Sequence, residues 1–205
     1  MTKDTVFVDT KMFDRLTVEL KGFEKEVGTA AFYALDRTIQ HVITQVGRIV
    51  PKEYAIKSTE VKDSFKGGIK KPSKTDLTAS ITSRGHTLTL AHFPHTPTKP
   101  MGKSKKYIKV QVKKTESKKY INVYPQPFVA STGAKTEDKI QFNIFRRLGK
   151  ARFPIEPLRT VSIPQMISNE GISQQIQKIA QDKLEERLEH EIIRNMTSLK
   201  EKVER

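Results

Sequence analysis

Three histidines lie close together in the sequence and have the side-chain type that a metal site needs. In an extended strand His86 and His92 would share one face, and His95 would follow in a loop. Three imidazole nitrogens can hold a metal ion and leave one coordination position open. No carboxylate lies near them in the sequence. We therefore interpret them as surface imidazoles at a strand end and predict no metal site.

Glu137, Asp138 and Lys139, with Asp76 upstream, have the residue types of a metal-dependent nuclease. Such enzymes use acids to hold a cation and a lysine to orient water. The acidic pair directly precedes an expected strand, which favours a solvated turn instead. The sequence has no glycine-rich phosphate loop, no nucleophile elbow and no cysteine. We expect no enzymatic activity, no catalytic residue and no cofactor.

A lysine-rich stretch over residues 98–119 is the strongest chemical signal, because it holds nine lysines and one acid, Glu116. Tyr107 lies within it and Tyr120 directly follows it. Phosphate backbones attract such surfaces, and aromatic rings can stack on unpaired bases. Arginine, the usual reader of base edges, is scarce here, so we do not expect sequence-specific DNA recognition. The alternatives are a lysine-rich edge that prevents unwanted strand pairing, or one that meets an acidic protein surface. The candidate contact residues are Lys99, Lys103, Lys105, Lys106, Lys109, Lys113, Lys114, Lys118 and Lys119.

Charge is unevenly distributed along the 205 residues, whose net charge is +15. The excess lies within residues 51–160, while the two ends are close to neutral. This asymmetry indicates an interaction surface in the middle of the chain. The N-terminus has no signal-like apolar region, and no run of apolar residues is long enough to cross a membrane. We expect one soluble domain over residues 1–205, made in the cytoplasm.

We expect two long helices, one on each side of this basic region in the sequence, to support it. Apolar residues recur at three- and four-residue steps before Pro51 and predict a helix over residues 17–50, which the proline ends. Ser58 could cap a short helix over residues 59–65. A second long apolar stripe predicts a C-terminal helix over residues 172–203, which is too long for one small domain and favours contact with a neighbouring subunit.

Between the helices the apolar period changes to two. Over residues 67–162 this alternation predicts several short strands in an antiparallel sheet with one buried face. Residues 83–85 are expected to form a hairpin turn, and residues 115–117 another. Residues 94–119 form the expected basic loop, of which residues 94–106 are extended and solvated. The predicted fold class is α+β, with an antiparallel sheet flanked by a long N-terminal and a long C-terminal helix.

Several segments together resemble a known family. Residues 34–38 read Ala-Leu-Asp-Arg-Thr, residues 54–57 read Tyr-Ala-Ile-Lys, and residues 128–130 read Phe-Val-Ala. Residues 146–155 end in Arg-Phe-Pro-Ile, and residues 161–167 read Val-Ser-Ile-Pro-Gln-Met-Ile. In this order they resemble the prophage minor tail protein Z family, the lambda-type tail-completion proteins of tailed bacteriophages, over about residues 25–170. The chain departs from the family pattern at Asp36, where Asn is commoner, and in the lysine-rich length of residues 98–119.

The resemblance implies a structural virion protein that completes the tail and forms part of the head–tail connection as a ring, with sixfold symmetry to match the tail tube. It implies the virion as location, assembly in the host cytoplasm, and partners among copies of itself, the tail terminator, the adaptor or connector, and the tube. DNA passing through the channel is a further expected partner. The alternatives are a basic, non-specific DNA-binding protein and a subunit like that of a tail-terminator ring. The candidate subunit or neck interface comprises Arg152, Phe153, Pro154, Ile155, Pro164, Gln165 and Met166.

Overall fold

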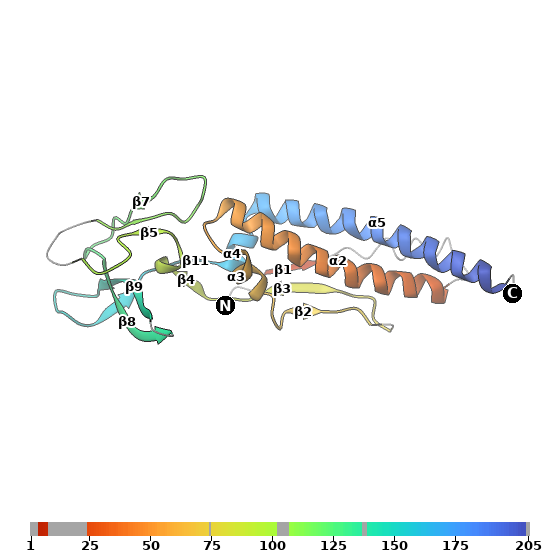
Figure 1. Ribbon diagram of the computed structural model, residues 1–205, viewed down its shortest axis with the longest axis horizontal. Coiled ribbons are helices and arrows are strands. Elements are labelled where there is room, and N and C mark those ends of the chain that lie inside the picture. The colour runs from red at the N-terminus through yellow and green to blue at the C-terminus, as the bar shows by residue number, and fades with distance from the viewer. Residues whose placement is uncertain (1–3, 8–23, 74, 102–106, 137–138, 204–205) are drawn as a thin grey trace.

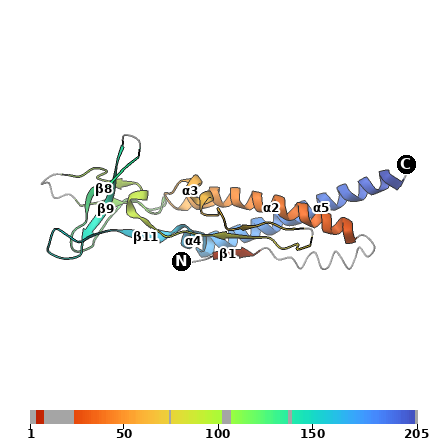
Figure 2. The ribbon, with the colours of Figure 1, turned by 90° about the horizontal axis from the view of Figure 1, so that it is seen from below.

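The protein is elongated, with two long helices and one small sheet (residues 4–7, 69–70 and 80–83) beside them at one end, and further small antiparallel sheets at the other (Figures 1 and 2). This computed structural model describes residues 4–7, 24–73, 75–101, 107–136 and 139–203. Helix α2 (Glu24–Glu53) and helix α5 (Glu170–Val203) lie side by side and run in opposite directions. Two shorter helices, α3 (Ser58–Asp63) and α4 (Ile163–Ile167), flank the pair. The predicted α+β class is confirmed.

Within the described residues, four small sheets replace the single predicted sheet. The first has the order β1–β3–β2 and comprises Asp4–Phe7, Ser80–Ser83 and Ile69–Lys70. The second pairs β11 (Arg159–Ser162) with β4 (Thr87–Thr89). The third has the order β5–β6–β7 and comprises His95–Thr96, Lys109–Val110 and Lys119–Tyr120. The fourth has the order β10–β9–β8 and comprises Ile155–Pro157, Lys139–Arg147 and Phe128–Thr136.

The predicted hairpin at residues 83–85 is wrong, because β3 and β4 belong to different sheets. β3 pairs with β1 and β2, whereas β4 pairs with the distant strand β11. The backbone N–H of Arg84 donates to the carbonyl of Ser64, 2.8 Å away, and this bond directs the chain away from a tight turn. The β4–β11 ribbon therefore links the helical end to the strand-rich end (Figures 1 and 2).

The predicted helix ends need three corrections. Helix α2 continues past Pro51 to Glu53, so the proline lies in its last turn instead of ending it. Ser58 is the first residue of α3 rather than its cap, and the capping position is held by Lys57 without a side-chain hydrogen bond. Helix α5 begins two residues before the predicted position. The predicted start of the first helix, over residues 17–23, lies outside the described residues.

The core is built mainly from the facing sides of α2 and α5. Buried residues recur on both helices at the three- and four-residue steps that keep side chains on one face. On α2 they are Ala30, Ala31, Ala34, Leu35, Ile39, Val42, Val46 and Ile49, and on α5 they are Ile172, Ile176, Ala180, Leu184 and Leu188.

A buried carboxylate interrupts this apolar seam toward the far end of α5. The Glu191 side chain has 0% exposure. One of its oxygens lies 2.9 Å from Nη1 of Arg37 on α2, and the other lies 3.2 Å from Nη1 of Arg194. Neither oxygen accepts a hydrogen bond of good geometry, so the contact is mainly a charge–charge attraction. The Arg194 guanidinium also lies over the ring of Tyr33, 5.8 Å from its centre, which fixes the register of the two helices.

Replacing Leu184 should show how much the helix pair contributes to stability. Leu184 is 2% exposed, so Leu184→Ala leaves a cavity between the helices and should lower the free energy of unfolding by about 2–5 kcal/mol. Urea unfolding followed by circular dichroism measures this change. Gln177→Ala, at an exposed position of the same helix, is the control and should change stability by less than about 0.5 kcal/mol. Equal effects of the two variants would contradict the assignment of the seam as the core.

Removing both cations from Glu191 should expose the cost of burying its charge. The double variant Arg37→Met, Arg194→Met should be destabilised by about 3–5 kcal/mol, since it leaves an uncompensated buried carboxylate. Adding Glu191→Leu should recover most of that loss, because no buried charge then remains. The cation–π contact with Tyr33 is absent from both variants, so it cancels in the comparison. Urea unfolding measures the free energy of unfolding of the two variants. A triple variant no more stable than the double one would refute this account.

Candidate functional site

The lysine-rich segment is fixed to the end of helix α2 by its backbone. The N–H of Ala55 donates to the carbonyl of Val112 at 2.8 Å, and the N–H of Lys114 donates to the carbonyl of Glu53 at 2.7 Å. Tyr54, between them, forms a β-bridge with Lys113. Burial raises the pKa of the Tyr54 hydroxyl, and the nearby Glu53 carboxylate raises it further, so this anchor stays neutral. The β5–β6–β7 sheet is therefore held by the rigid helix pair.

Six of the nine candidate lysines lie in the described part of the chain, and Lys103, Lys105 and Lys106 lie outside it. Three of the six have polar partners. Lys113 lies 3.9 Å from Glu53, Lys119 lies 2.6 Å from Glu116, and Lys118 donates to the Thr96 hydroxyl at 3.0 Å. The hydrogen bond from Lys119 lowers the pKa of Glu116, so that pair remains charged. Within the described ranges, the ammonium groups of Lys99 and Lys114 have no partner.

Two tyrosines form an exposed aromatic pair beside these lysines. The rings of Tyr107 and Tyr120 meet edge to face, with 5.9 Å between their centres. The Lys109 ammonium lies 4.4 Å from the centre of the Tyr120 ring, within cation–π range. The β6–β7 register places Lys109 directly opposite Tyr120.

These rings form one wall of an open groove of about 650 Å³. The sequence prediction named Tyr107 and Tyr120 but missed Tyr124, which is 89% exposed. Its only signal in the sequence was an aromatic residue directly before a proline. We call this feature the tyrosine groove, and its lining residues are Tyr107, Tyr120, Ile121, Asn122, Val123, Tyr124 and Gln126.

The first half of the candidate interface is an exposed loop between β9 and β10. Arg152, Phe153 and Pro154 are all exposed, and Ile155 is partly buried at the start of β10. The Arg152 guanidinium lies 5.7 Å from the centre of the Phe153 ring. The loop closes through the N–H of Leu148, which donates to the carbonyl of Pro154 at 3.1 Å. The loop lies at the same strand-rich end of the molecule as the β5–β6–β7 sheet (Figures 1 and 2).

In the second half of the candidate interface two residues belong to the core, whereas Gln165 is exposed. Pro164 and Met166 are buried in α4, and Met166 has 0% exposure, so its side chain cannot reach a partner. Gln165 forms a capping box with Ser162. The Ser162 N–H donates to Gln165 Oε1 at 2.9 Å, and the Gln165 N–H donates to Ser162 Oγ at 3.3 Å. The Pro-Gln-Met segment therefore starts a helix.

The three histidines do not converge. His92 ends a 3₁₀ turn, Leu90–His92, so it does not continue the strand face predicted to carry His86. Its Nδ1 lies 3.4 Å from Glu60, a carboxylate distant in sequence but near in space. Nδ1 of His95 lies 2.8 Å from the carbonyl of Phe93. Among the described residues, no group of three or more histidines and acids could hold a metal ion.

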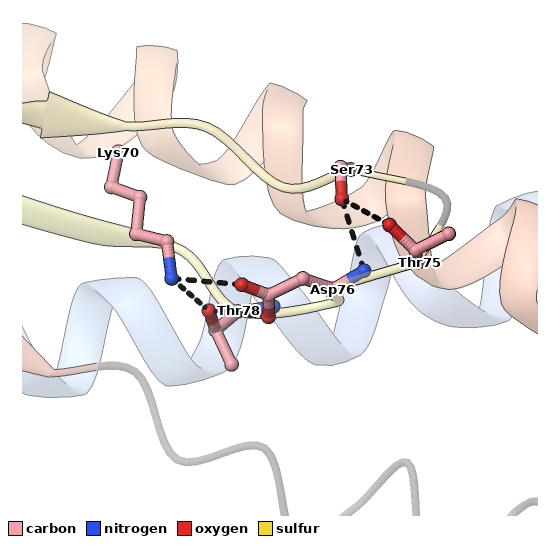
Figure 3. A network of polar contacts seen from close by, with 5 residues as sticks. All are labelled: Lys70, Ser73, Thr75, Asp76 and Thr78. Atoms are coloured by element: carbon pink, nitrogen blue, oxygen red, sulfur yellow. Dashed lines mark hydrogen bonds and ion pairs between the residues drawn. The ribbon is translucent and has the colours of Figure 1, made fainter.

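Asp76 closes the loop between β2 and β3 (Figure 3). Its carboxylate accepts hydrogen bonds from Lys70 Nζ at 2.9 Å and from the Thr78 hydroxyl at 2.7 Å. Its backbone N–H donates to the Ser73 hydroxyl at 3.0 Å. The bonds from Lys70 and Thr78 hold the pKa of Asp76 at about 2. This carboxylate is engaged in loop structure, while Glu137 and Asp138 lie outside the described residues.

The family comparison agrees with the resemblance seen in the sequence. The family described as prophage minor tail protein Z (GPZ) matches residues 11–201. No curated protein and no solved structure gives a significant match. Within the described parts of the chain, no helix combines the length and the apolar character needed to cross a membrane.

The Asp76 network predicts a local pH dependence. The pKa of Asp76 falls from 3.8 to about 2 on folding, so its contribution to loop stability is complete above pH 3.8 and is lost as the pH falls through about 2. Lys70→Gln removes the main cause and should raise the Asp76 pKa toward 3.8. Carboxyl NMR titration measures both values. Lys66→Gln, whose lysine pairs with Asp63 instead, should leave Asp76 unchanged, and a wild-type pKa near 3.8 would disprove the network.

Proposed function

The chain belongs to the prophage minor tail protein Z family, and we propose from this membership that it completes the tail and forms part of the head–tail connection as a ring. The family is one of structural tail proteins of bacteriophages, and the match covers residues 11–201 of 205. That match is the observation that carries the proposal. The location that follows is the virion, after assembly in the host cytoplasm.

The distribution of exposed apolar side chains supports a partner at the strand-rich end. Large exposed hydrophobic patches mark interaction sites. Tyr33 and Ile193 are exposed on the helix pair, but most of the large exposed side chains belong to the strands and loops of the other end. Those at the strand-rich end are Tyr107, Tyr120, Tyr124, Ile140, Leu148 and Phe153.

The shape of the subunit supports a ring. Its two ends differ in structure and charge, so copies can join through unlike surfaces, and such heterologous contacts form a ring where the rotation between neighbouring copies closes. We propose a homo-oligomer, six subunits in number, bound to neighbouring neck proteins such as the terminator, the adaptor or connector, and the tube. DNA would pass through its channel. The chain remains a single domain in this proposal, since backbone hydrogen bonds join the end of α2, at Glu53 and Ala55, to Lys114 and Val112.

Tails made without this protein test the proposal. Adding the purified chain should restore head joining and infectivity, and electron microscopy should show added ring density at the head-proximal end of the tail. Tails that join heads equally well without the protein would refute the tail-completion role. A chain that restores joining but remains monomeric on the tail would refute the ring.

The exposed loop around Phe153 provides the variant for the same assay. Phe153 is 63% exposed at the strand-rich end, and Ile193 is 66% exposed on α5, so the two form a matched pair. Phe153→Ala should lower head joining about tenfold or more, as expected for an aromatic anchor. Ile193→Ala should leave it unchanged. Equal activity of the two variants would remove this loop from the interface.

A further inference from the structure

We propose that the tyrosine groove is a docking site for an acidic segment of a neighbouring virion protein. This inference rests on the proposed function, because the partner is taken to be another protein of the same particle. It goes further by assigning a site and the chemistry of its occupant.

The lining of the groove fits a polypeptide segment. Tyrosine offers an apolar ring together with a hydroxyl group, and it is enriched at protein interfaces for that reason. The side-chain amides of Asn122 and Gln126 add hydrogen-bond donors and acceptors that can pair with a peptide backbone. The groove is open and holds about 650 Å³, so an extended segment can lie along it.

The charge around the groove selects an acidic occupant. The described part of residues 98–119 contains six lysines, and its one acid, Glu116, is already paired with Lys119. Lys109 lies over the Tyr120 ring at the groove itself. A carboxylate of the occupant could reach this ammonium while apolar parts of the same segment contact the tyrosine rings. The surrounding positive potential would also speed the encounter with an acidic segment.

Duplex DNA fits this surface less well. Binding to a phosphate backbone depends on many lysines free to neutralise phosphates. Of the six described lysines, Lys113, Lys118 and Lys119 have polar partners and Lys109 rests on a ring. Tyrosine stacking needs unpaired bases, which a duplex does not offer. The rings therefore gain more from a protein segment.

The groove is also organised before binding. The N–H of Ile121 donates to the carbonyl of Ile108 at 2.9 Å, which continues the β6–β7 pairing into the groove wall. The amide of Gln111 donates to the carbonyl of Glu116 at 2.9 Å and holds the β6–β7 turn. Because these bonds already order the wall, the groove itself loses less conformational entropy when a partner docks.

Binding of the full-length chain to isolated tails and to isolated DNA-filled heads, each prepared without this protein, tests the inference. The double variant Tyr107→Ala, Tyr120→Ala should bind its target about tenfold to a hundredfold more weakly, because it loses both rings and the cation–π contact that positions Lys109. Tyr33→Ala, on α2, is the matched control and should bind normally. Wild-type binding should weaken as salt is raised, and excess duplex DNA should not compete. Thermal unfolding of each variant confirms that the fold is retained.

The outcomes separate the inference from the proposed function. A wild-type chain that binds neither tails nor heads refutes the proposed function. If the wild type binds but the double tyrosine variant binds equally well, the groove is not the docking site and the proposed function stands. If duplex DNA displaces the chain, the occupant is nucleic acid. A photoreactive phenylalanine analogue at position 124 in assembled particles should cross-link to a protein peptide richer in acids than in bases. A cross-link to DNA or to a basic peptide would overturn the inference.

Discussion

The packing of α2 against α5 is the interaction on which the other elements depend. The two helices contribute half of the buried apolar side chains of the core, whereas β2, β5, β6 and β7 have only two residues each. Strands this short cannot form a stable sheet by themselves. Two of the small sheets are instead fastened to a helical element. The β5–β6–β7 sheet is joined to the end of α2 by backbone hydrogen bonds of Ala55 and Lys114. Strand β11 leads directly into α4, which begins with the Ser162 capping box. Loss of the helix pair would therefore release these sheets as well.

This arrangement separates the part that confers stability from the part that meets partners. The long helices carry the core and a buried ion cluster around Glu191, and the strand-rich end carries most of the exposed aromatic residues and the lysine excess. Loops held on a rigid scaffold can expose apolar side chains at little cost to the core. For a structural tail protein this is an appropriate division, because contacts with neighbours can be made without opening the subunit.

The long helices were predictable from the sequence because a repeat sustained over thirty residues is a strong signal. The sheets were not. A strand of two residues is too short to show an alternation of apolar and polar side chains. In addition, β4 pairs with β11, which is far along the chain, so the local pattern suggested a hairpin that the structure does not contain. The role expected of the lysines stays a prediction, and the pairing of Lys113 with Glu53 depends on the fold and has no local signal in the sequence. Tyr124 lies between Val123 and Pro125 in a largely apolar stretch and yet is exposed, while Met166 lies in a motif that suggested contact and yet is buried. In both cases tertiary packing decides what periodicity cannot.

The tyrosine rings hold one lysine ammonium group of the basic region in a defined position. A lysine-rich stretch alone attracts any polyanion, since flexible ammonium groups in water bind without defined geometry. Here Lys109 is seated on Tyr120, and Tyr120 is paired with Tyr107. An occupant that reaches this ammonium must therefore also cover the rings, and its charge and its apolar surface have to match the groove together. That joint requirement excludes ligands that offer negative charge alone, and it is the physical reason for preferring an acidic protein segment to duplex DNA.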